Sequence, residues 1–179
     1  MIRALSLAFL LGLGACAATQ PTAETPRTVE RVDLSRYVGL WHEVARLPQR
    51  FQDSERLRCE EVTAEYTAQP DGRIGVVNSC VNALDPARPR SVARGQAYVV
   101  EGSNNTRLRV SFFWPFYGDY WVFGLDPDYR WAVVGSPSRR SLWVLSRTPT
   151  LPAEELERAL GIARAQGFSL TPLVRATMR

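Results

Sequence analysis

Few residues in this 179-residue chain could perform acid-base, metal or nucleophilic chemistry. The only histidine is His42, and strand alternation places it on the opposite face from the adjacent Trp41. The sequence holds no Ser-His-Asp arrangement, no metal-spaced His/Cys cluster and no glycine-rich phosphate loop. Glu43 and Glu65 are candidate acid-base groups, but carboxylates on strands are usually surface residues. We therefore expect a binding protein rather than an enzyme, with no metal and no cofactor.

One of the three cysteines lies in a segment with the form of a lipoprotein signal. Arg3 precedes an apolar run, residues 4–13, and small residues lead to Cys16. In such a signal residues 1–15 are removed and the Cys16 thiol receives diacylglycerol, which anchors a protein to a membrane without spanning it. The competing interpretation is an ordinary signal peptide that is cut nearby.

The rest of the chain is predicted to form one domain behind a linker. Residues 16–32 are rich in Thr, Pro and charge, and we interpret them as a flexible tether. Residues 33–179 are long enough for one domain with a sizeable core. All basic residues are arginines interspersed with acids, and the formal charge is only +4. This pattern shows no nucleic-acid-binding stripe.

The other two cysteines, Cys59 and Cys80, form an even pair in an oxidising compartment. Asp71-Gly72 lies midway between them as a hairpin turn, so residues 61–67 and 74–81 can pair and bring the two thiols close. We predict a disulfide between them. A free reactive thiol, which would support a lipid isomerase, is the alternative.

Between the linker and the C-terminal region, almost every segment carries strand or turn signals. Alternating or β-rich runs bounded by turn residues predict eight strands, at residues 40–47, 60–67, 74–81, 92–100, 106–113, 119–125, 130–135 and 141–147. Eight antiparallel strands can close into an up-and-down barrel wide enough for one small ligand. A β-sandwich is less consistent with the short links. One helix is predicted near the C-terminus, packed outside the barrel through a stripe of Leu156, Ala159, Leu160 and Ala163.

Two features at opposite ends of this β-rich region suggest how the barrel closes. Gly39 and Trp41 lie at the start of the first strand, and Arg147 ends the last one. An aromatic plug would fill the narrow end of the barrel, with the guanidinium stacked on its face.

This pairing resembles the lipocalin signature, and three stretches make the resemblance specific to the bacterial lipocalins, the outer-membrane lipoprotein branch related to apolipoprotein D. They are Tyr37-Val-Gly-Leu-Trp-His-Glu-Val-Ala-Arg46, Ser111-Phe-Phe-Trp-Pro-Phe-Tyr-Gly-Asp-Tyr120 and Leu142-Trp-Val-Leu-Ser-Arg-Thr-Pro149. The second lipocalin motif usually reads Thr-Asp-Tyr, whereas this chain has Asp126-Pro-Asp128-Tyr129. The resemblance implies the same all-β barrel with one outer helix.

The ligand-binding face is predicted from alternation and from the resemblance. Alternation turns Leu108, Val110 and Phe112 inward, and it places Trp143 and Leu145 on the inner face with Arg147. Both faces of residues 120–125 are apolar, so alternation leaves their direction open. The resemblance implies that Trp121 and Phe123 face the cavity and that Asn78 is a polar group that orients the ligand. Plain core packing is the alternative for each aromatic residue.

The predicted mouth of the barrel carries charges and aromatic residues. The resemblance to lipocalins implies that the loop of residues 48–58 overhangs the mouth, and its Arg50, Arg56 and Arg58 could hold a phosphate or carboxylate headgroup. A solvated loop is the alternative. The loop of residues 114–119 also borders the mouth, and its aromatics could enter a membrane or contact a partner chain.

Together these features predict a membrane-anchored protein that holds a fatty acid or lysophospholipid, for envelope maintenance. Ala17 and Ala18 follow Cys16 with no Asp, which favours the bacterial outer membrane, facing the periplasm. The alternative is a structural or interaction lipoprotein with a filled barrel, acting through the aromatic loop of residues 114–117. The sequence leaves open whether the chain forms a homodimer.

Overall fold

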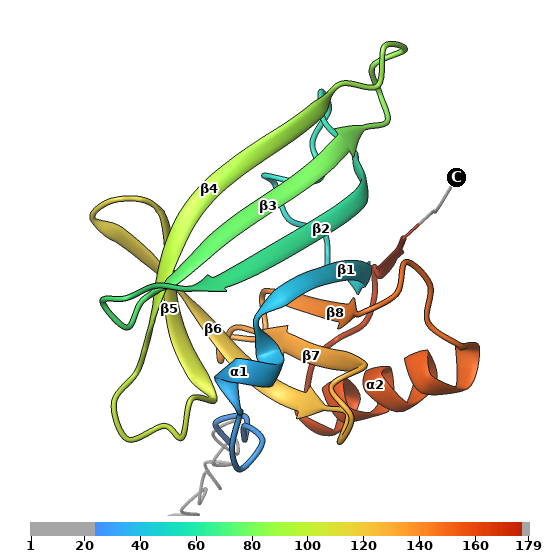
Figure 1. Ribbon diagram of the computed structural model, residues 1–179. Coiled ribbons are helices and arrows are strands. Elements are labelled where there is room, and N and C mark those ends of the chain that lie inside the picture. Colours follow the sequence, from blue (N-terminus) through green and yellow to red (C-terminus); the bar gives the residue numbers. More distant parts are fainter. Residues whose placement is uncertain (1–23, 177–179) are drawn as a thin grey trace, which may run out of the picture.

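The computed structural model describes residues 24–176, whose main feature is an antiparallel sheet closed into a barrel (Figure 1). Eight strands follow one another around the barrel, and β1 pairs with both β2 and β8 to close it. They are β1 (Gly39–Arg46), β2 (Cys59–Ala68), β3 (Ile74–Asn82), β4 (Arg90–Val99), β5 (Arg107–Phe113), β6 (Phe116–Leu125), β7 (Trp131–Gly135) and β8 (Leu142–Ser146). The predicted barrel is confirmed, and the sandwich is excluded. A short additional strand, β9 (Val174–Arg175), pairs with the end of β1.

Side chains alternate between two apolar layers, one inside the barrel and one outside it. The inner layer includes Trp41, Leu108 and Leu145. The outer layer lies under α2 (Ala153–Ala165), which packs against the barrel wall (Figure 1). All four residues of the predicted stripe, Leu156, Ala159, Leu160 and Ala163, are buried. The helix therefore covers the barrel wall, as its periodicity predicts.

The barrel has a closed end, formed around Trp41 and the short helix α1 (Leu34–Tyr37). Trp41 is fully buried, and its Nε1 donates a hydrogen bond to the carbonyl of Tyr37 at 2.8 Å. The Arg147 guanidinium stacks on the indole, with its Cζ 3.8 Å from the ring centroid. Gly39 adopts a positive φ of 97° between α1 and β1, a conformation that glycine takes without steric cost. Gly39, Trp41 and Arg147 thus form the closure that the sequence predicts.

The strand connections divide between this closed end and the opposite, open end. Because the strands run alternately up and down, the links of residues 69–73, 100–106 and 126–130 lie at the closed end. The links at the open end are residues 47–58, 83–89, 114–115 and 136–141. There β4 separates from β5, since their pairing begins only at Gln96 and Ser111. The first half of β4 is consequently exposed, and the barrel wall spreads at this end.

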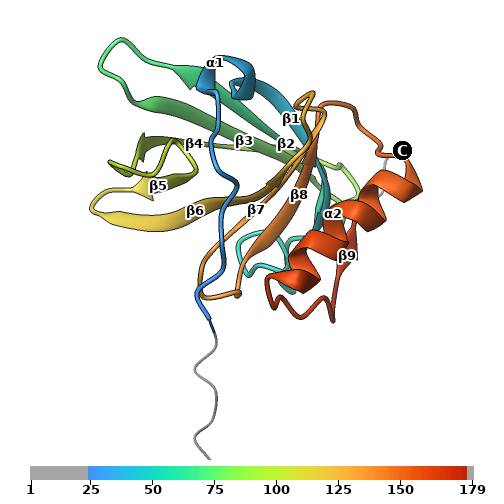
Figure 2. The same cartoon turned by 90° about the horizontal axis from the view of Figure 1, so that it is seen from below.

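Residues 24–33 form a strap along the outside of the barrel, which runs from the open end to α1 (Figure 2). The carbonyl of Glu24 accepts a hydrogen bond from Arg139 in the open-end link. Further along, Val29 N donates to Val122 O at 2.9 Å, and Val32 is almost fully buried. The prediction of a flexible tether is therefore wrong for residues 24–32, because backbone hydrogen bonds and valine side chains hold this segment on the barrel.

The remaining predictions about the N-terminus concern residues outside the described part of the chain. These are the signal at residues 1–15, the lipid attachment site at Cys16 and the first half of the tether. Within residues 24–176, no helix is long and apolar enough to cross a membrane.

Candidate functional site

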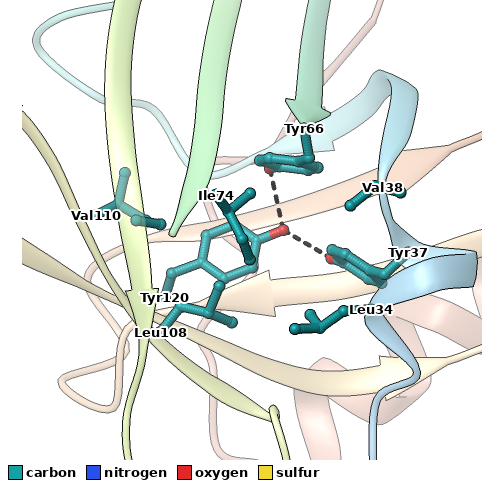
Figure 3. Close-up of a pocket in the computed structure, with 9 residues that line it drawn as sticks. Leu34, Tyr37, Val38, Tyr66, Ile74, Leu108, Val110 and Tyr120 are labelled. Carbon is teal, nitrogen blue, oxygen red and sulfur yellow. Dashed lines mark hydrogen bonds between the residues drawn. The ribbon is translucent and has the colours of Figure 1, made fainter. Parts of the chain in front are cut away.

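A small apolar cavity, with room for little more than one water molecule, lies in the closed half of the barrel (Figure 3). Three of its residues come from or follow α1, and the others come from strands β2 to β6. The lining residues are Leu34, Tyr37, Val38, Tyr66, Ile74, Ala97, Leu108, Val110 and Tyr120. No charged side chain is among them. The chemistry of this lining suits a hydrocarbon chain.

Three tyrosine hydroxyls meet at the wall of this cavity (Figure 3). Tyr120 Oη lies 2.7 Å from Tyr37 Oη and accepts a hydrogen bond from Tyr66 Oη at 3.1 Å. Burial raises the pKa of Tyr66 to about 12 and raises the pKa values of Tyr37 and Tyr120 well above 10.0. All three groups stay neutral at physiological pH. They can therefore exchange hydrogen bonds but carry no charge that would oppose an acyl chain.

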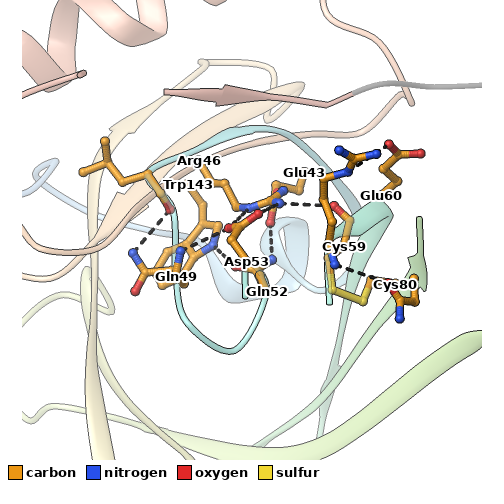
Figure 4. Close-up of polar contacts among 12 residues, drawn as sticks. Glu43, Arg46, Gln49, Gln52, Asp53, Cys59, Glu60, Cys80 and Trp143 are labelled. Carbon is orange, nitrogen blue, oxygen red and sulfur yellow. Dashed lines mark hydrogen bonds and ion pairs between the residues drawn. A yellow bond between two sulfur atoms is a disulfide. The ribbon is translucent and has the colours of Figure 1, made fainter. Parts of the chain in front are cut away.

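A buried ionic network lies on the inner side of the open end (Figure 4). Arg46 is only 1% exposed, and its Nη1 donates to Glu43 Oε1 at 2.6 Å. Its Nε donates to Asp53 Oδ2 at 2.8 Å. Gln52 donates from Nε2 to the other oxygen of Glu43 and accepts from Trp143 Nε1 at 3.0 Å. These bonds hold the link of residues 47–58 against strands β1 and β8.

The two acids of this network respond differently to their surroundings. Burial raises the pKa of Glu43 above its ordinary value, even though Arg46 and Gln52 favour the ionised form. Burial acts in the same direction on Asp53, but there the hydrogen bonds from Arg46 and from the Gln49 amide hold the pKa below its ordinary value. Glu43 lies inside the barrel and is 4% exposed, so its expected surface position is wrong. Glu65 is exposed, as expected.

The predicted disulfide joins Cys59 to Cys80 across the β2–β3 pair at the open end. Their Cα atoms lie 5.3 Å apart. The Cys59 carbonyl also accepts a hydrogen bond from Arg46 Nη2 at 3.1 Å (Figure 4). The disulfide is thus connected to the ionic network, and neither sulfur is a free thiol. Among residues 24–176, no group of three or more His, Cys, Asp or Glu side chains is arranged to hold a metal ion.

Most of the predicted ligand-binding residues face the barrel interior. Leu108 and Val110 line the cavity itself. Phe112, Trp143 and Leu145 belong to the same inner layer but do not line the cavity. Phe112 packs over Gly95, where a Cβ atom would come within 2.8 Å of its ring. Contact of these five residues with a ligand stays a prediction.

Asn78 also lies on the inner face, since it alternates with Val76 and pairs with Ala64 of β2. Its Oδ1 is buried and accepts no hydrogen bond from the described residues. Buried polar atoms are usually paired. An acceptor of this kind is suited to a donor group on a ligand.

The expectation that Trp121 and Phe123 face the cavity is wrong. Phe123 packs in the outer layer, with its ring centroid 5.2 Å from that of Phe168. Trp121 lies on the same side, where the Arg107 guanidinium sits 5.3 Å from the ring centroid. The inner face of β6 is formed instead by Tyr120 and Val122. Since both faces of this strand are apolar, the sequence pattern contained no signal for the correct alternative.

The three predicted headgroup arginines all lie on the open-end link of residues 47–58 and are exposed. Arg58 Nε lies 3.7 Å from Glu60 Oε1, which makes a weak ion pair at the surface. No contact joins Arg50, Arg56 or Arg58 to the cavity lining. Their role in binding a headgroup remains a prediction.

Sequence reasoning missed the tyrosine cluster and the buried Arg46. Tyr66 and Val76 are cross-strand partners on the inner face, so strand alternation contained a signal for Tyr66. Tyr37 lies on α1, which was not predicted. Arg46 lies at the end of β1 beside Trp143, and its charge would ordinarily indicate an exposed position.

Comparison with known proteins gives consistent matches over most of the chain. A family model described as "Lipocalin-like domain" matches residues 32–178. "Outer membrane lipoprotein Blc" of Citrobacter freundii is 38% identical over 175 residues, covering 97% of this chain and 93% of the relative. The protein of the same name from Vibrio cholerae is 39% identical over 152 residues, which cover 84% of this chain and 85% of the relative.

The fold also matches solved structures. Insecticyanin from the tobacco hornworm Manduca sexta superposes with a TM-score of 0.68, covering 88% of this chain and 87% of that one. The sequence identity is 18%, so this likeness concerns the fold alone.

Proposed function

The chain belongs to the lipocalin family, and from this premise we propose that its barrel is a carrier for a fatty acid or a lysophospholipid. The proposal is carried by the apolar inner face of the barrel, where the small cavity has no charged side chain in its lining. Burial of an acyl chain there contributes about 25 cal/mol for each Å² of apolar surface removed from water. A carrier needs no catalytic group, which agrees with the neutral tyrosines and the paired cysteines.

The cavity would receive the end of the acyl chain farthest from the headgroup. The cavity is small in this structure, with space for little more than one water molecule, so the inner side chains must move apart to admit the acyl chain. The rest of the chain would pass Val110 and Phe112 toward the open end. The headgroup then lies at the mouth, and on the way to it Asn78 Oδ1, in the middle of β3, offers an acceptor to a hydroxyl or ammonium group.

The exposed arginines of the open-end link supply the corresponding positive charge. Arg50, Arg56 and Arg58 would attract the phosphate of a lysophospholipid or the carboxylate of a fatty acid. We test this by changing the three together to glutamine. The affinity for anionic lysophosphatidylglycerol should fall, whereas unchanged affinity would remove the arginines from the site.

Cellular location is inferred from the N-terminal signal and the relatives. Two relatives are named outer membrane lipoproteins, and both are more than 35% identical to this chain. We propose lipid attachment at Cys16 and residence at the bacterial outer membrane, facing the periplasm, with a role in envelope maintenance. Mass spectrometry of the intact membrane-extracted chain tests the attachment, because a diacylated Cys16 adds a defined mass.

The test of the carrier function is native mass spectrometry of residues 24–179, titrated with palmitate and lysophosphatidylethanolamine. This fragment starts at Glu24 because the strap packs on the barrel. Ala97 lines the cavity, so Ala97→Leu fills part of its volume and should weaken the one-to-one lipid adduct. Ala68→Leu adds the same atoms at an exposed position and is the matched control.

A second candidate function is an interaction lipoprotein whose barrel is filled by its own side chains. The exposed aromatic residues at the tip of the β5–β6 hairpin favour this alternative. It predicts no lipid adduct with either probe and identical behaviour of the Ala97→Leu and Ala68→Leu variants.

A further inference from the structure

Exposed aromatic side chains are concentrated at the open end of the barrel. Phe113, Trp114 and Phe116 form the tip of the β5–β6 hairpin and are 80%, 81% and 76% exposed. Phe51 and Leu84 are also exposed, on two of the other open-end links, residues 47–58 and 83–89. Single exposed apolar residues are ordinary, but a set gathered at one end of a domain indicates a contact surface.

Positive charge is concentrated on the same end. The open-end links carry six arginines and three carboxylates. The closed-end links carry two arginines and four carboxylates. Aromatic residues mixed with excess arginine are typical of surfaces that contact the interface of an anionic membrane.

The strap determines where the chain leaves the barrel. Glu24 is held by Arg139 at the open end, whereas the other end of the strap meets α1 at the closed end. Seven residues separate Cys16 from Glu24, and the eight Cα–Cα steps between them reach about 28 Å at most when extended. The ten residues of β6 alone extend about 33 Å along the barrel wall. An anchor at Cys16 therefore keeps the membrane near the open end.

We propose that the open end docks on the lipid surface, with the hairpin tip in the membrane interface and the mouth facing the bilayer. This proposal rests on lipid attachment at Cys16 and extends the carrier function, since the ligand can pass between membrane and barrel without crossing water. The partner that contacts the exposed aromatic residues of the open end is the lipid bilayer itself. The strap supplies the orientation, and the hairpin tip and the arginines supply the contact.

The experiment measures which end of the lipidated full-length protein touches the bilayer. The protein is reconstituted in vesicles of phosphatidylethanolamine and phosphatidylglycerol whose acyl chains carry bromine, a contact quencher of tryptophan. The emission of Trp114 is obtained as the difference from Trp114→Phe. A matched reporter is placed at the closed end by Leu40→Trp in the Trp114→Phe background, since Leu40 is also exposed.

We expect bromine to reduce the Trp114 emission about twofold, because tryptophan prefers the membrane interface. The reporter at position 40 should keep its emission. Equal quenching at both positions, or none at Trp114, would overturn the proposal. A blue shift of Trp114 without quenching would also overturn it and would assign the surface to a second copy of the chain.

Two measurements on the same samples separate this proposal from the proposed function. The intact mass reports whether Cys16 is acylated, and an unmodified Cys16 overturns the docking orientation while leaving the cavity intact. Native mass spectrometry of the lipid adduct reports the carrier function alone. Loss of that adduct with Trp114 still quenched would reject the carrier but keep the docked orientation.

Discussion

At the closed end of the barrel, Trp41 and Tyr37 pack their rings 5.1 Å apart, whereas at the open end the rings of Phe113 and Phe116 extend into solvent. The closed end keeps its cation, Arg147, stacked on the tryptophan. At the open end Arg46 is buried between two carboxylates. The same residue types thus have opposite surroundings at the two ends. The closed end is therefore built for stability, and the open end for access.

The energetics of the two ends support this division. Burial of aromatic rings contributes directly to the free energy of unfolding. A buried ion pair contributes little in net terms, because desolvation of its charges offsets their attraction. The network around Arg46 holds the open-end link in position without adding much stability. An end that is held in place but not tightly packed is suited to the passage of a ligand.

The largest expected effect is the loss of the closed-end plug. Trp41→Ala should lower the free energy of unfolding by about 3–5 kcal/mol, because a fully buried indole is replaced by a cavity. Trp143→Ala, in the half-buried open region, should cost clearly less. Urea unfolding followed by circular dichroism measures both variants. Equal losses would contradict the division between a stable end and an accessible end.

The next effect concerns the buried arginine of the open end. Arg46→Met leaves Glu43 buried without its cation and should cost about 3 kcal/mol, the lower limit for breaking a buried pair. Because burial already raises the pKa of Glu43, this side chain can take up a proton once Arg46 is removed. That protonation keeps the loss in the free energy of unfolding at about 3 kcal/mol, the lower limit. The matched change Arg147→Met removes a half-exposed cation stacked on Trp41. If it proves more costly than Arg46→Met in the same urea experiment, the network is less important than its burial implies.

The sequence predicted the barrel because its signals are local. Turn residues bound each strand, the alternation along 106–113 has a clear polar side, and the direction of 141–147 follows from placing Arg147 beside Trp41. Along β6 both sides are apolar, and a bulge between Val122 and Gly124 shifts the register. Alternation therefore could not show that Tyr120 rather than Trp121 faces inward.

Other parts of the site could not be predicted because they violate the usual relation between polarity and exposure. Glu43 and Arg46 lie inside the barrel, where each charge is compensated only by partners brought together in the fold. The strap has the composition of a linker, yet Val29 and Val32 hold it on the wall. Compensation between distant residues leaves no trace in local sequence patterns.

A smaller effect is expected in the pH dependence of the free energy of unfolding. The contributions of Asp53 and Glu43 should change with pH in opposite directions, because their pKa values are shifted in opposite directions. The lowered pKa of Asp53 means that its stabilisation is present above the ordinary value of 3.8 and is lost as the pH falls through the lower folded value. Asp53→Asn should therefore cost about 1–2 kcal/mol at neutral pH, and the difference from the wild type should close in acid.

Glu43 should show the reverse behaviour. Its raised pKa makes the native state less stable as the pH rises from the ordinary value of 4.5 through the folded value. Stability of Glu43→Gln relative to the wild type should accordingly increase across that window. Urea unfolding at a series of pH values measures both variants. If the free energy of unfolding changes with pH in the same way for Asp53→Asn and Glu43→Gln, the two acids do not occupy different environments.

The smallest effect on stability is expected at the hairpin tip. Phe113→Ser and Phe116→Ser remove rings that are already exposed in the folded protein, so each should change the free energy of unfolding by less than about 0.5 kcal/mol. Phe123→Ser removes a ring that is 4% exposed under α2 and is the matched control, with an expected loss of several kcal/mol. A substantial loss at Phe113 or Phe116 would mean that the tip packs within the protein. If the serine variants are instead as stable as the wild type, stability does not explain why large aromatic side chains occupy the hairpin tip. Contact with a surface outside the barrel then explains their presence.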